Sequence, residues 1–204
     1  MMKNISCVLF DLGGVIVNWH NSWFIQELCE EFQLQPGELS KEFDKNLVDI
    51  STGRITEKEF WHTIGSKLES PKLMNFEESL LDKIFRKRVS LNEPVIELSR
   101  NLSQKGITVG ILSNTEPVTF SVVEDLLSLD HFKHKFLSYE IGHLKPEPEI
   151  YQYVIENIPF DKDELFFIDD LKSNVESAIS AGIDSVQYTD YDKLVQEFHV
   201  RKLL

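Results

Sequence analysis

The stretch ISCVLFDLGGV, residues 5–15, is the most informative part of this chain. A short apolar run ends in a single carboxylate, Asp11, and a glycine pair follows it. An apolar run bounded by glycine predicts a buried strand, and open α/β sheets bind their ligands at the carboxyl ends of such strands. Gly13 and Gly14 permit a sharp turn and a close approach of the backbone to a ligand. By itself the stretch is equally compatible with a strand that ends in a solvated aspartate.

Two further apolar runs end in small or acidic polar residues. Residues 109–115 read VGILSNT, and residues 165–170 read LFFIDD. Between them, residues 142–148 read GHLKPEP and hold Lys145 between glycine and proline. Three strand ends of this kind and one anchored cation would be an unusual coincidence in a chain without a functional site.

Taken together, these four stretches resemble the four motifs of the haloacid dehalogenase-like hydrolase superfamily, in the expected order. The resemblance extends from residue 5 to about residue 188. It implies an α/β fold with a doubly wound, Rossmann-like parallel sheet. It also implies a small all-helical cap domain inserted after the first motif.

The periodicity of the chain supports this organisation. Apolar residues at helical spacing predict an early group of helices, and the pattern Thr56-x-x-Glu59 predicts a capping box at the start of the third. No strand is predicted between residues 18 and 106. Strand and helix patterns then alternate, which predicts a parallel sheet with right-handed crossovers. The expected helices are 23–32, 37–49, 56–68, 76–89, 117–128, 148–157, 171–181 and 191–199, and the later strands are 107–112, 135–139, 165–169 and 184–188.

These patterns predict two domains. The core comprises residues 1–17 and 91–204, and the helical cap comprises residues 18–90. A plain α/β domain with an extended helical face is the alternative. The length of 204 residues suits one domain or one domain with an insert.

Charge and hydropathy limit the kinds of partner and the cellular location that this chain is expected to have. The net charge of −13 at pH 7 argues against nucleic acid as a partner, because phosphates would be repelled. The first apolar run is too short for a signal peptide or a membrane span, so no membrane association and a cytoplasmic location are expected. The expected partner is a small phosphorylated substrate, and the chain is expected to be a monomer or a homodimer.

The acidic residues suit phosphoryl transfer. Asp11 is the expected nucleophile, since a carboxylate can attack phosphorus and form an aspartyl-phosphate. Mg²⁺ is the expected cofactor, bound by carboxylates and the substrate phosphate. Its expected ligands are Asp11, Asp170, Asp169 and the backbone carbonyl of Gly13, while Asn174 could hold a metal-bound water. Alternatively, Asp169 and Asp170 lie at a helix N-terminus only because negative charge there is favourable to the helix dipole.

Other polar residues suit the phosphate group. By the family resemblance Ser113 binds the phosphate, and the backbone N–H groups of Asn114 and Thr115 could assist it. Gly14 is a further candidate for phosphate binding. Lys145 is expected to act in catalysis by neutralising Asp11 and the phosphate.

One position departs from the family pattern. Most phosphatases of the family carry a second aspartate two residues after the nucleophile, where it protonates the leaving group, but this chain has Gly13. Relatives with an Asp-x-Gly-Gly/Asn pattern, notably a sugar-1-phosphate phosphatase-like branch, share the departure. His20 could replace the missing acid. Arg54 could reach the substrate, although a solvated arginine is the simpler interpretation.

The sequence leaves three functions open. The first, which we favour, is a Mg²⁺-dependent phosphatase of a small phosphometabolite, such as a sugar phosphate. The second is a metal-independent hydrolase of the 2-haloacid dehalogenase type, in which the same aspartate attacks carbon. The third is a non-catalytic member of the fold that binds a phosphate or a protein.

Overall fold

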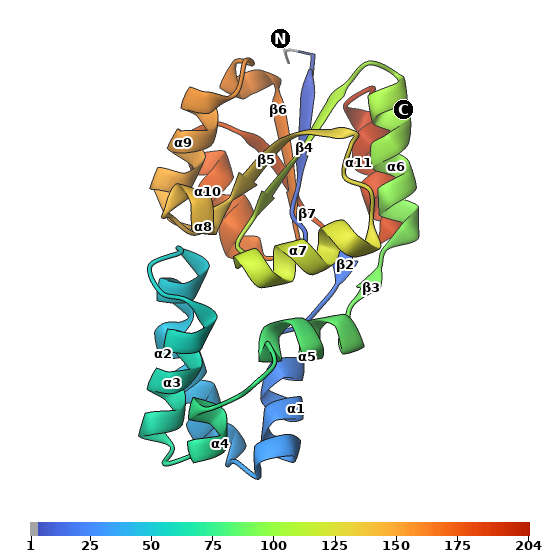
Figure 1. The fold of residues 1–204 in the computed structure, drawn as a ribbon. Coiled ribbons are helices and arrows are strands. Elements are labelled where there is room, and N and C mark those ends of the chain that lie inside the picture. The colour runs from blue at the N-terminus through green and yellow to red at the C-terminus, as the bar shows by residue number, and fades with distance from the viewer. Residues whose placement is uncertain (1–3) are drawn as a thin grey trace.

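A five-stranded parallel sheet forms the centre of the protein. The computed structural model describes residues 4–204 (Figure 1). The strand order is β5-β4-β1-β6-β7, and every pairing is parallel. The predicted α/β parallel sheet is therefore confirmed. The strands are β1 (Cys7–Phe10), β4 (Thr108–Ser113), β5 (Phe132–Leu137), β6 (Leu165–Asp169) and β7 (Asp184–Gln187).

Helices cover both faces of this sheet. Figure 1 shows α6 (Glu93–Gln104) and α11 (Tyr191–Val200) on one side, and α9 (Pro148–Asn157) and α10 (Lys172–Ala181) on the other. Alternate side chains of β1 enter two separate apolar clusters, with Val8 and Phe10 in one and Cys7 and Leu9 in the other. Burial on both faces explains why the strands are apolar throughout rather than alternating with polar residues.

The helical insert leaves the core through a short antiparallel pair of strands. Val17–Asn18 (β2) pairs with Ser90–Leu91 (β3), so the chain enters and leaves the insert at one place. Figure 1 shows the insert beneath the carboxyl ends of the core strands. We propose that this insert is the cap expected for residues 18–90. Its helices are α1 (Ser22–Phe32), α2 (Pro36–Ser51), α3 (Glu57–Lys67), α4 (Pro71–Met74) and α5 (Leu80–Arg88).

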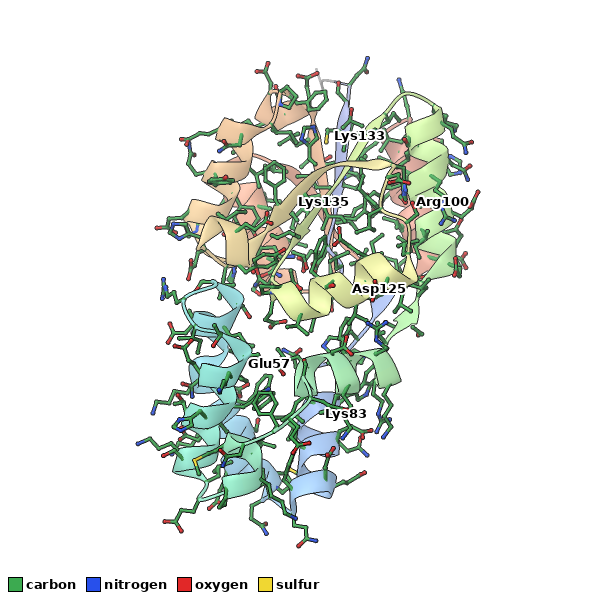
Figure 2. The ribbon with its side chains drawn as sticks, in the orientation of Figure 1. Glu57, Lys83, Arg100, Asp125, Lys133 and Lys135 are labelled. Atoms are coloured by element: carbon green, nitrogen blue, oxygen red, sulfur yellow. The ribbon has the colours of Figure 1, made fainter. Side chains whose placement is uncertain are left out.

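Glu57 and Lys83 connect the helices of the insert (Figure 2). The carboxylate of Glu57 accepts hydrogen bonds from the Trp61 indole at 3.0 Å, the Ser79 hydroxyl at 2.7 Å and the Leu81 backbone N–H at 2.8 Å. These bonds join the start of α3 to the start of α5, while Lys83 pairs with Glu31 of α1 at 2.7 Å. The capping box predicted at Thr56 is present.

Several elements differ from the expectation, among them β3 and α6. The strand β3 lies within the range where no strand was predicted, because two residues are too short to produce a periodic signal. The helix α6 lies in a stretch for which no element was predicted, and its buried side chains complete one face of the sheet. The remaining elements are α7 (Pro117–Leu126), α8 (Ser138–Ile141) and the 3₁₀ turn Lys162–Glu164. Across residues 4–204, no helix is long and apolar enough to cross a membrane.

Candidate active site

The strand order brings the predicted polar residues together. The central strand β1 lies between β4 and β6, with Phe10 level with Ile111 on one side and Ile168 on the other. The residues after these positions are therefore neighbours at one edge of the sheet. Continued by one residue, this register puts Asp11 level with Leu112 and Asp169, and Ser113 is the next residue of β4. Lys145 reaches the same edge from the loop between α8 and α9.

Lys145 is the buried cation of the site. Its side chain is only 1% exposed, and its Nζ lies 2.9 Å from Asp11 Oδ1 and 2.6 Å from Asp169 Oδ2. It also donates to the Leu112 carbonyl at 2.9 Å. Burial acts to lower the pKa of Lys145, but the charges of Asp11 and Asp169 outweigh burial, and the pKa is raised. The lysine is therefore charged and held beside the expected nucleophile.

The two oxygens of Asp11 differ in their surroundings. Oδ1 accepts from Lys145 and from the Leu12 backbone N–H at 2.7 Å. Oδ2 accepts no hydrogen bond from any residue between 4 and 204. Burial, aided by the negative charges of Asp169 and Asp170, raises the pKa of Asp11 to about 7 despite the opposing effect of Lys145. One oxygen is thus anchored and the other is available to a ligand.

Asp169 is fully engaged by protein groups. Its Oδ2 accepts from Lys145, its Oδ1 accepts from the Leu171 backbone N–H at 2.8 Å, and Asn174 donates to both oxygens at 2.9 and 3.0 Å. The roles expected of Asp169 as a metal ligand and of Asn174 in holding a metal-bound water stay predictions; in this structure the amide group of Asn174 holds Asp169. We infer that Asp169 positions Lys145.

Asp170 lies against the backbone of Gly14. Gly14 has a φ of +76°, and a Cβ atom built on it would lie 2.4 Å from Asp170 Oδ2. Its N–H group donates to the Val17 carbonyl at 2.8 Å, so it is not free for phosphate, contrary to the expectation. The absence of a side chain at Gly14 instead leaves room for Asp170. Gly13 lines the cavity, its φ is not positive, and a Cβ there would meet nothing within 4 Å.

The residues after β4 have divided roles. Ser113 is buried and lines the cavity, as a phosphate ligand must. The Asn114 side chain accepts from the Lys145 backbone N–H and donates to its carbonyl, both at 2.8 Å. The Asn114 side chain therefore fixes the loop that carries Lys145. The backbone N–H of Asn114 stays the candidate for phosphate binding. The Thr115 N–H donates to Ser138 at 2.9 Å and is not available.

A cavity of about 380 Å³ connects these groups to the helical insert. His20 lines this cavity, which a role as proton donor would require. Its ring contacts that of Trp23 edge-on, with 5.2 Å between the centroids. Arg54 is exposed, pairs with Asp49 at 3.4 Å and is not among the lining residues. Glu116 also lines the cavity. The sequence analysis did not single out Glu116. The signal that could have found it is its position directly after Ser113, Asn114 and Thr115.

The comparison with protein families agrees with this geometry. The family model described as haloacid dehalogenase-like hydrolase matches residues 5–182. The chain belongs to this family. The matched part of this haloacid dehalogenase-like chain includes Asp11, Ser113, Lys145 and Asp170, which all line one cavity.

Several known proteins are similar over nearly the whole chain. The D-ribitol-5-phosphate phosphatase of Bacteroides thetaiotaomicron is 28% identical over 199 residues, covering 92% of this chain and 92% of that protein. The sesquiterpene phosphatase astK of Aspergillus oryzae is 25% identical over 195 residues, covering 93% of each. By contrast, the matched part is 20% of the length of the bifunctional epoxide hydrolase 2 of Rattus norvegicus.

A solved structure resembles this fold and holds ligands. It is an enzyme of the same family from Bacteroides thetaiotaomicron, in complex with magnesium and inorganic phosphate. Its TM-score is 0.79 at 26% sequence identity, with coverage of 94% of this chain and 99% of that one.

Proposed function

We propose that this protein is a Mg²⁺-dependent phosphatase that hydrolyses a small phosphate monoester through an aspartyl-phosphate on Asp11. The observation that carries the proposal is the state of Asp11, whose Oδ1 is fixed by Lys145 while Oδ2 accepts no hydrogen bond from the part of the chain that the structure describes. The two phosphatases among its relatives and the magnesium–phosphate complex of a similar structure support it.

The proposed reaction has two displacements. In the first, Asp11 Oδ2 attacks phosphorus, the bond from phosphorus to the ester oxygen breaks, and the alkoxide leaves and takes a proton from His20 or from water. In the second, water attacks the same phosphorus, the bond to Asp11 breaks and inorganic phosphate is released. Lys145 stabilises the charge of Asp11 and of the phosphate oxygens, and Ser113 orients the phosphate.

The acidic groups fit a divalent cation. Carboxylate oxygens of Asp11, Asp169 and Asp170 lie within 4.8 Å of one another. When all three are ionised, Lys145 leaves two negative charges uncompensated, and hard oxygen ligands of this kind suit Mg²⁺. Asp11, Asp170 and the carbonyl of Gly13 would hold the ion. Bound there, Mg²⁺ would neutralise charge on the phosphate and keep Asp11 ionised.

Removing the metal is expected to abolish activity. Chelation should reduce phosphate release to background, and Mg²⁺ should restore it. Mg²⁺ should also raise the melting temperature, because it binds only the folded acidic cluster. Asp170→Asn should remove most of that thermal shift, whereas Asp44→Asn, an exposed aspartate on α2 outside the cavity, should leave it unchanged. Hydrolysis of 2-haloacids in excess chelator, without phosphatase activity, would instead establish the dehalogenase function.

Restoring the missing carboxylate is expected to help poor leaving groups. Gly13→Asp should accelerate alkyl phosphates by up to ~10²-fold while changing aryl phosphates little, because general acid catalysis matters most for basic leaving groups. The backbone at Gly13 accepts a side chain without a clash, so the variant should fold. The measurement is a leaving-group series on both proteins, with thermal melting beside it.

The same series tests His20. Without another acid, rates of the wild type should depend steeply on leaving-group acidity. A flat series in the wild type that His20→Gln makes steep would identify His20 as the proton donor. A flat series unchanged by His20→Gln would exclude His20 and direct attention to other residues of the cavity wall.

The cytoplasmic location and the monomeric or homodimeric state stay predictions.

A further inference from the structure

The cavity has two chemically different parts. Around Asp11 it is charged and polar, as described above. Away from Asp11 its wall is apolar and is formed mainly by the insert. We call this part the apolar wall; it consists of Trp19, Phe24, Phe43, Leu47 and Phe85 from the insert and Val123 from α7 of the core.

The rings of the apolar wall pack against one another. Trp19 lies with its ring centroid 4.7 Å from that of Phe24 and 4.6 Å from that of Phe85, and Phe24 lies 6.0 Å from Phe43. Phe24, Phe43 and Phe85 are buried. Rings packed in this way are held in fixed orientations. The wall is therefore preformed, and it presents carbon atoms to whatever is attached to the phosphate.

Polar groups beside the apolar wall are already paired with one another. The Trp19 indole N–H donates to Asn21 at 3.0 Å. Glu116 accepts from Ser51 at 3.1 Å and from Thr119 at 2.7 Å. These pairs occupy the Trp19 indole and the Ser51 and Thr119 hydroxyls, and they leave the side-chain N–H groups of Asn21, which lines the cavity, open to a bound ligand. The His20 imidazole also makes no hydrogen bond to any residue between 4 and 204, but one imidazole and one amide cannot satisfy the several hydroxyl groups of a polyol.

This pairing discriminates between substrates. A polyol would bury hydroxyl groups against carbon and against groups whose hydrogen bonds are already made, and each unsatisfied hydroxyl is costly. An alkyl or prenyl chain would lose only its contact with water, which is favourable. We propose that the substrate is the monophosphate ester of an apolar alcohol. This inference rests on the proposed phosphatase function and specifies its substrate class.

The size of the cavity limits the substrate. A volume of about 380 Å³ corresponds to about a dozen water-sized groups. The phosphate uses about five of these, so roughly six to eight remain for carbon atoms of the alcohol.

A series of straight-chain alkyl monophosphates tests the proposal. Ethyl, butyl, hexyl and octyl phosphates have leaving groups of nearly equal acidity, so a trend in kcat/KM reports binding of the chain. With saturating Mg²⁺, kcat/KM should rise by about two- to fourfold for each added methylene until the cavity is filled. A flat or falling series, with measurable turnover, would overturn the substrate class and leave the phosphatase function standing.

A comparison at equal chain length sharpens the test. Hexyl phosphate should be hydrolysed at least tenfold more efficiently than a hexitol monophosphate. The polyol is the better leaving group, so this preference cannot come from leaving-group acidity. Faster turnover of the hexitol phosphate would overturn the proposal, and so would faster turnover of choline phosphate, whose cation could pair with Glu116. No phosphate release from any ester, p-nitrophenyl phosphate included, would overturn the phosphatase function and this inference together.

A pair of adjacent variants localises the effect. Leu47 lies on the apolar wall, while Val48 is the next residue of α2, is 42% exposed and does not line the cavity. Leu47→Gln should reduce the ratio of octyl to ethyl kcat/KM by about tenfold, and Val48→Gln should leave that ratio unchanged. Equal ratios in both variants would show that the apolar wall does not select the chain. The wild-type series decides the proposal even if Leu47→Gln does not fold.

Discussion

Asp11→Asn is expected to lower kcat by about 10⁴-fold or more, because loss of a nucleophile costs on this order. The amide has nearly the shape of the carboxylate but cannot form the acyl-phosphate. Its folding should not suffer, since Lys145 keeps its second partner, Asp169, at 2.6 Å. The measurement is phosphate release with Mg²⁺ present, together with binding of beryllium fluoride, a mimic of the aspartyl-phosphate, to Asp11 in the wild type only. Retention of most of the activity would refute the assignment of the nucleophile.

Asp11→Asn is also expected to change how the stability of the fold depends on pH. Burial raises the pKa of Asp11 from 3.8 to about 7, so the metal-free native state binds more protons than the unfolded chain between these values. Asp11 therefore destabilises the metal-free fold increasingly as the pH rises from about 4 to about 7. Asp11→Asn should remove that contribution, and its advantage in melting temperature over the wild type should be larger at pH 8 than at pH 5. An equal difference at both values would contradict the raised pKa.

Lys145→Met is expected to abolish activity and to destabilise the protein by about 3–5 kcal/mol, the usual cost of leaving buried charges without their partner. Methionine has a similar length without the charge. Asp11 and Asp169 would then face each other without the ammonium group that now lies 2.9 and 2.6 Å from them. Mg²⁺ should recover part of the melting temperature, because the ion supplies positive charge, but it should not recover turnover.

Two controls separate the charge of Lys145 from general damage. Lys133→Met removes an exposed lysine of β5, labelled in Figure 2, and should change neither activity nor melting. Adding Asp169→Asn to Lys145→Met should recover stability, because one of the two unpaired charges is removed, while activity stays lost. Normal stability of Lys145→Met alone would show that the ion pairs seen here contribute little to folding.

Much of the fold followed from local patterns. The apolar runs predicted β1, β4 and β6 because buried parallel strands carry apolar side chains on both faces. Polar residues placed directly after those runs predicted the site, since strand ends of a parallel sheet meet at one edge. The pair β2–β3 was not predicted, because two-residue strands carry no periodic signal and their partners are distant in the chain. The helix α6 was missed although Val95, Ile96, Leu98 and Leu102 fall at helical spacing and are buried.

The sequence by itself determined which residues meet at the carboxyl edge of the sheet, because the order of motifs and the parallel topology leave little freedom there. Only the tertiary structure decided what each residue does. Asp169 and Asn114 are engaged with Lys145, and Gly14 leaves space for Asp170, because hydrogen bonds and close contacts depend on three-dimensional distances. Similarly, Phe24, Phe43 and Phe85 come from α1, α2 and α5 and Trp19 from the segment before α1, and only folding brings these rings to the cavity that Asp11 also lines.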